Sequence, residues 1–86
     1  MATVGEVRAE LERLAEHTRG LGQTVRRCHS DLEEAAQRVN AVSVGTENLN
    51  LVEAIARFRA ADRMLTDAAD MFDEAADELS GYQASL

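Results

Sequence analysis

The sequence predicts an all-α fold: one domain, residues 1–86, forming a long antiparallel hairpin of two coiled-coil-like helices. Two long segments repeat apolar residues in alternating steps of three and four, the spacing that keeps one stripe of a helix against a partner. The chain contains no proline, which would interrupt such helices. Residues 43–48 hold the only cluster of turn formers between the repeats, and so short a connection makes the two helices antiparallel neighbours.

The first helix is expected at about residues 4–42. Thr3 and Glu6 have the spacing of a capping box, in which the hydroxyl accepts from a free amide of the first turn. The small residues Ala15, Gly22 and Ala36 follow one edge of its stripe and indicate close approach of a second helix. The stripe itself comprises Val4, Val7, Leu11, Leu14, Thr18, Leu21, Val25, Cys28, Leu32, Ala35, Val39 and Val42.

Gly20 and Gly22 are unusual within a helix, because glycine costs about 1 kcal/mol relative to alanine there. They mark either a hinge or close-contact notch, or simply a weak turn that the helix tolerates.

The turn is expected at about residues 43–48, with Gly45 in the left-handed conformation that ends a helix. The second helix, at about residues 49–84, has two candidate caps, Asn48 and Asn50. Its predicted stripe comprises Leu51, Ile55, Phe58, Ala61, Leu65, Ala68, Phe72, Ala75, Leu79, Tyr82 and Leu86.

These stripes predict which residues form the seam between the helices. Cys28 cannot form an internal disulfide, because it is the only cysteine, and its place in the repeat suggests a small buried hydrophobe that resists thiol reagents. The predicted helix-seam core consists of Leu11, Leu14, Leu21, Val25, Cys28, Leu32, Leu65, Phe72 and Leu79.

A single seam barely offsets the conformational entropy of so small a chain, so a further covered surface is expected. Met64 and Met71 widen the stripe of the second helix beyond what one facing helix requires. We therefore expect a homodimer, or a pair with another helical protein, that completes a four-helix bundle. The alternative is that both methionines cover the edges of the hairpin's own core.

Charge limits the class of partner. Sixteen acidic residues and nine basic ones give a net charge of −7, which argues against nucleic acid and against anionic membrane surfaces. Acidic residues also crowd the second helix between Asp67 and Glu78, either as a face for a basic partner or as a solvated surface. The candidate partner interface comprises Met64, Met71, Asp70, Asp73, Glu74 and Asp77.

No catalytic, cofactor or metal site is expected. His29 and Glu33 are four residues apart, but without further ligands they indicate a surface contact. Cys28 and His29 are adjacent on a helix, so their side chains point about 100° apart and cannot act as nucleophile and base. We expect a protein that is not an enzyme and takes no small-molecule substrate or cofactor.

The sequence has neither a signal-peptide pattern nor an apolar run long enough to span a membrane. Membrane insertion is not expected. The expected location is the cytoplasm, with export by a signal-peptide-independent secretion system as an alternative.

The chain resembles the WXG-type small helical hairpins of type VII secretion in its size, its capped first helix, its turn centred on Gly45 and its alanine-rich second helix. Val44-Gly45-Thr46 has the glycine of that turn without its tryptophan, and Tyr82 is followed four residues later by Leu86, where the family's export signal has an acid. It also resembles uncharacterised actinobacterial helical modules associated with polymorphic toxins, which share a Gly-Thr turn and a segment like Glu53-Ala54-Ile55.

The resemblance implies a non-catalytic interaction module that binds itself or a helical partner. The competing hypothesis is a cytosolic regulator, similar to an immunity protein or antitoxin, that masks a basic site with the acidic residues of the second helix.

Overall fold

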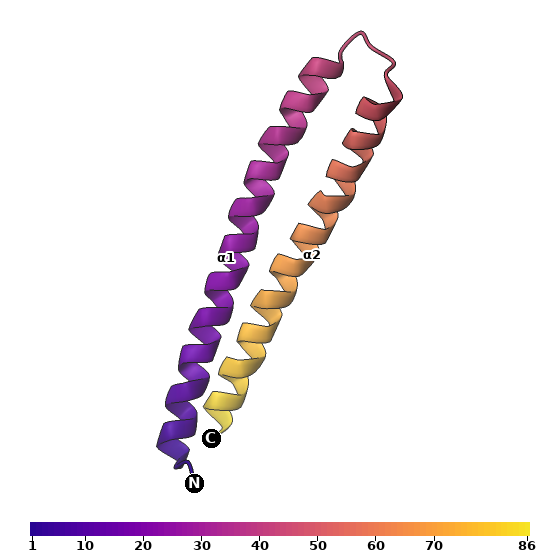
Figure 1. The fold of residues 1–86 in the computed structure, drawn as a ribbon. Coiled ribbons are helices and arrows are strands. Elements are labelled where there is room, and N and C mark those ends of the chain that lie inside the picture. Colours follow the sequence, from indigo (N-terminus) through magenta and orange to yellow (C-terminus); the bar gives the residue numbers. More distant parts are fainter.

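The protein is a helical hairpin, as the sequence predicts. The structure, a computed structural model, describes all residues 1–86 and contains two helices, α1 (Val4–Ser43) and α2 (Leu49–Ser85). They run antiparallel along their whole length, with both chain ends at the same end of a rod measuring 64 × 19 × 14 Å (Figure 1). All tertiary packing is therefore contact between these two helices.

Side-chain caps and one glycine set the helix boundaries. The Oγ1 of Thr3 accepts from the backbone N–H of Glu6 at 3.1 Å, which confirms the cap predicted for α1. Gly45 has φ +80°, the left-handed conformation expected at the turn. Of the two candidate caps for α2, Asn48 fills the role, because its side chain accepts from the N–H groups of Asn50 and Leu51.

The seam between the helices is made of small residues. Ala76 is fully buried, and Ala15 and Ala69 are 2% and 4% exposed. Gly22 is also buried, and a Cβ built there would lie 3.4 Å from the Cβ of Phe72, so its lack of a side chain permits the close approach. A Cβ at Gly20 would meet nothing within 4 Å, so of the two glycines only Gly22 is a contact notch.

Each helix contributes three columns of residues, spaced by seven, to the predicted apolar stripe and its edge. The inner column faces the other helix most directly and holds Ala15, Gly22, His29 and Ala36 on α1 and Asp62, Ala69, Ala76 and Gln83 on α2. Beside it, the middle column is mostly half-buried and holds Leu11, Thr18, Val25, Leu32 and Val39 on α1 and Phe58, Leu65, Phe72 and Leu79 on α2. The outer column follows, with Leu14, Leu21, Cys28, Ala35 and Val42 on α1 and Ala54, Ala61, Ala68, Ala75 and Tyr82 on α2.

Of the predicted seam core, the middle-column residues are half-buried, whereas three residues of α1 are exposed, contrary to the prediction. Leu14 and Leu21 are 43% and 39% exposed, and Cys28 is exposed as well. Compared with the predicted orientation, each helix turns its inner column toward the other helix, because alanine and glycine allow the two backbones to approach more closely than leucine does. The outer column of α1 is consequently left at the edge of the seam.

Candidate interaction surface

One long side of the hairpin carries the polar contacts between the helices, and we call this side the polar flank. Arg26 pairs with Asp73 through both carboxylate oxygens. Arg19 donates to the Oγ of Ser80 at 2.9 Å, and its guanidinium lies 3.8 Å from the carboxylate of Asp77. Because these side chains are about half-exposed or more, the contacts fix the relative rotation of the helices more than they add stability.

The pairing on the polar flank changes the ionisation of its charged groups. The guanidinium of Arg26 donates hydrogen bonds to Asp73 and lowers the pKa of that carboxyl below its ordinary value. The same contact raises the pKa of Arg26. Asp73 is therefore ionised to lower pH in the folded hairpin than in the unfolded chain.

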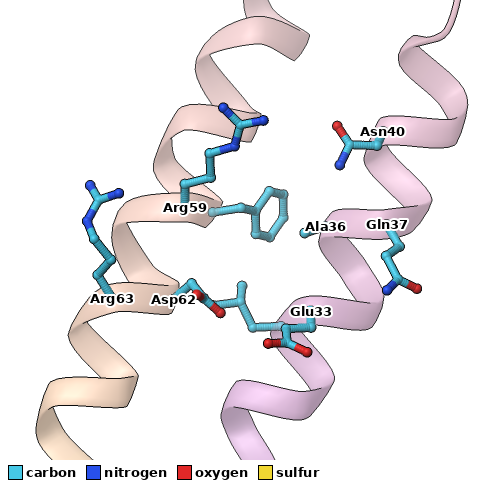
Figure 2. A pocket seen from close by; sticks show the side chains of 9 residues that line it. Glu33, Ala36, Gln37, Asn40, Arg59, Asp62 and Arg63 are labelled. Atoms are coloured by element: carbon cyan, nitrogen blue, oxygen red, sulfur yellow. The ribbon is translucent and has the colours of Figure 1, made fainter.

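Further along this flank, His29 meets two carboxylates. Its Nε2 lies 2.6 Å from the Oδ1 of Asp62 and 3.4 Å from the Oε1 of Glu33. Figure 2 shows Glu33 on α1 and Asp62 on α2 directed toward one another across a groove that Gln37, Asn40, Arg59 and Arg63 also line. The contact expected between His29 and Glu33 is thus joined by Asp62, which sequence reasoning missed because it comes from the other helix.

The donor atoms of His29, Glu33 and Asp62 all lie within 4.8 Å of one another, so this trio is the set in the chain that could hold a divalent cation. Without an ion, the same arrangement is a close contact of one imidazole with two carboxylates, one of which comes from the other helix. Its side chains are 26%, 56% and 40% exposed, too open for a preformed water-excluding catalytic site.

The opposite long side of the hairpin is apolar. On each helix the outer column lies roughly 150° around the axis from the residues that form the polar flank, because each residue turns the helix by about 100°. Arg26 and Asp73 meet on one side of the seam, so both outer columns lie together on the other side. A shallow hollow there is lined by Leu32, Phe58, Ala54, Ala61 and Arg57, four of them apolar.

Met64 and Met71 extend this surface. They occupy the next column of α2 beyond the outer column and are 69% and 66% exposed, so they do not cover the hairpin's own core. Together with the two outer columns they form what we call the apolar face: Leu14, Leu21, Cys28, Ala35, Val42, Ala54, Ala61, Ala68, Ala75, Tyr82, Met64 and Met71. No cross-helix ion pair lies on this side.

The acidic members of the predicted partner interface lie elsewhere. Asp73 and Asp77 are engaged with Arg26 and Arg19 on the polar flank. Asp70 is exposed beside Arg26 on the same flank, and Glu74 is exposed on the back of α2; neither makes an ion pair. The predicted interface is therefore divided: its methionines belong to the apolar face, and its acids belong to the other surfaces.

The fold and these surfaces define a class, an all-α helical hairpin with one polar and one apolar side. No model of a protein family matches the chain, and neither the curated proteins nor the solved structures contain a match to it. Neither helix carries an apolar stretch sufficient to cross a bilayer.

Proposed function

We propose that the protein is a non-catalytic interaction module that docks a helical partner on its apolar face. The observation that carries this proposal is the row of exposed large apolar side chains along that side, among them Leu14, Leu21 and Tyr82. Exposed apolar area of this extent is costly in water and is typical of a surface that another protein covers.

The proposal includes a biological setting. A small helical hairpin with an apolar docking side fits the role of a partner protein in type VII secretion or beside a polymorphic toxin. The Gly45 turn and the Glu53-Ala54-Ile55 segment support this setting by resemblance, as does the absence of lysine, which suits an actinobacterial composition. In such a system the protein acts in the cytoplasm or is exported without a signal peptide.

Site-specific photo-cross-linking tests the docking face. A photoreactive residue replaces Leu21 on the apolar face or, as a matched control, Gln23 two positions away on the exposed opposite side. Irradiation in the producing cells should give a discrete adduct from position 21 only, and mass spectrometry identifies the partner. Equal adducts from both positions, or no adduct from position 21, contradict the proposal.

A second candidate function is masking of a basic site, as an immunity protein or antitoxin does. The observation in its favour is that Asp67, Asp70 and Glu74 are exposed on α2 and make no ion pair. Binding through these acids should weaken steeply with added salt and with Asp70→Asn plus Glu74→Gln, whereas docking on the apolar face should tolerate both.

A further inference from the structure

We infer that the occupant of the apolar face is a second copy of this chain, turned end over end so that α1 packs on α1 and α2 on α2. The twofold axis crosses α1 at Thr24 and α2 midway between Met64 and Met71. This inference rests on the proposed function and names the partner. It is carried by the surface area, by the charges beside the apolar face, and by the register of the two helices.

The exposed area is large for so small a chain. The accessible surface is 6400 Å², and the chain mass is 9.4 kDa. A compact monomer of this mass exposes about 5000 Å². The excess of about 1400 Å² exceeds the roughly 800 Å² per partner that a standard protein interface buries.

The column of α1 that borders the apolar face is complementary in charge to an antiparallel copy of itself. It reads Glu10, His17, Thr24, Asp31 and Arg38. Rotation about Thr24 sets Glu10 of one copy against Arg38 of the other, and His17 against Asp31. Each pair combines an acid with a base, and each occurs twice in the dimer, so this pairing favours an isologous contact.

The bordering column of α2 matches itself in the same way. It contains Arg57, Met64, Met71 and Glu78, spaced by seven. Rotation about the midpoint of the two methionines sets Met64 of one copy against Met71 of the other, and Arg57 against Glu78. An apolar centre thus lies between two oppositely charged ends.

The two points where the proposed axis crosses the helices, Thr24 on α1 and the methionine midpoint on α2, lie at similar heights along the rod. His29 lies five residues from Thr24 toward the turn, and Asp62 lies five to six residues from the methionine midpoint toward the turn. The Nε2 of His29 is 2.6 Å from the Oδ1 of Asp62, so these residues are at similar heights. Both helices rise about 1.5 Å per residue, and one twofold axis therefore passes within about one helical turn of both centres.

The other twofold arrangement has its axis along the rod and sets α1 against α2 of the second copy. The turns then lie at the same end, and Arg38 of each copy approaches Arg57 of the other. Two like-charged contacts of this kind disfavour that arrangement. The charge pattern thus selects the dimer with its two turns at opposite ends.

Light scattering of the full chain at micromolar concentrations provides the first test, with a dimer as the expected result. The rate at which a maleimide labels Cys28, which lies on the apolar face, should also fall as concentration rises. A monomer with concentration-independent labelling overturns the inference. The proposed function then stands or falls separately on the photo-cross-linking experiment, since an adduct with a different protein at position 21 would support docking without a second copy.

Charge reversal tests the register of the dimer. Neither Arg57 nor Glu78 takes part in an ion pair within the hairpin. We expect Arg57→Glu alone or Glu78→Arg alone to weaken dimerisation about tenfold, because each places two like-charged pairs at the interface. The double reversal should restore it. Failure of the double variant to recover, with helicity unchanged by circular dichroism, overturns the register.

Cross-linking locates the axis. In a Cys28→Ser background, Thr24→Cys should be joined efficiently to its own symmetry mate by a short bis-maleimide reagent. Ser30→Cys, exposed on the opposite side of α1, is the matched control and should remain monomeric on a denaturing gel. A dimer in which position 24 does not cross-link, or in which both positions cross-link equally, contradicts the proposed axis.

Discussion

The polar flank and the apolar face are built from the same two helices and differ in how their residues are used. On the polar flank, Arg26, Asp73, His29 and Asp62 meet across the seam within one chain. On the apolar face, Leu21, Met64 and Met71 are exposed to solvent, and no ion pair joins the two helices. The difference teaches that the ion pairs between the helices gather on one side of the hairpin, whereas the other side presents apolar side chains to solvent and is the surface we propose for docking.

The largest effect on stability is expected where a seam residue of α2 is truncated, and its neighbour on the apolar face provides the comparison. Phe72 is half-buried against Gly22, whereas Met71 is exposed. We expect Phe72→Ala to reduce the free energy of unfolding by about 3 kcal/mol, and Met71→Ala by less than about 1 kcal/mol. Urea unfolding at low protein concentration measures both. Equal losses would mean that Met71 belongs to the internal core.

Enlarging an alanine side chain also distinguishes the seam from the apolar face. Ala76 is fully buried, whereas Ala75 is exposed on the apolar face. Ala76→Leu should destabilise the hairpin by about 2 kcal/mol because its side chain forces the helices apart. Ala75→Leu should leave thermal unfolding of the hairpin nearly unchanged. If Ala76→Leu were tolerated as well, the close seam would not exist in solution.

The two mid-helix glycines give a smaller contrast. Gly20→Ala meets no atom within 4 Å and should stabilise α1 by about 1 kcal/mol through helix propensity. Gly22→Ala gains the same propensity, but its Cβ would lie 3.2 Å from the Oδ1 of Asp73 and 3.4 Å from the Cβ of Phe72. We expect its gain, measured by thermal melting, to be smaller or reversed. A larger gain at Gly22 would contradict the notch.

The smallest effect concerns acid pH. Arg26 lowers the pKa of Asp73 in the folded state, so the stability from this pair is present above the ordinary pKa of an aspartate. It is lost as the pH falls through the lowered value. In Arg26→Gln this part of the acid-induced loss should disappear, while Arg27→Gln, whose residue makes no ion pair, should keep it. Unfolding curves across acid pH compare the variants.

The helices, the turn and the caps could be predicted because they depend on local chemistry. The spacing of apolar residues, the Thr3 and Asn48 caps and the conformation of Gly45 are readable from neighbouring residues alone. The choice of seam was harder, because α1 carries apolar or small residues in three adjacent columns. Ranking them by hydrophobicity favoured Leu14, Leu21 and Cys28, whereas close backbone packing favours Ala15 and Gly22.

The sequence nevertheless contains two patterns that indicate which sides of the helices face each other. Ala69 and Ala76 repeat on α2 with the same spacing as Ala15 and Gly22 on α1, so small residues can meet in register along the seam. The basic Arg19 and Arg26 beside one column also match the acidic Asp77 and Asp73 beside the other. Reading both helices together, rather than each stripe separately, would have indicated which sides face one another.

The adjacent ends of the chain have a mechanical consequence. Both termini lie at the same end of the rod, and every tertiary contact joins α1 to α2 (Figure 1). Tension applied between the termini therefore loads the contacts in sequence, from the packing around Ala15 through the Arg19 and Ser80 pair and on toward Gly45. The hairpin should unzip gradually at low force, whereas pulling between the turn and one terminus would shear the whole seam at once.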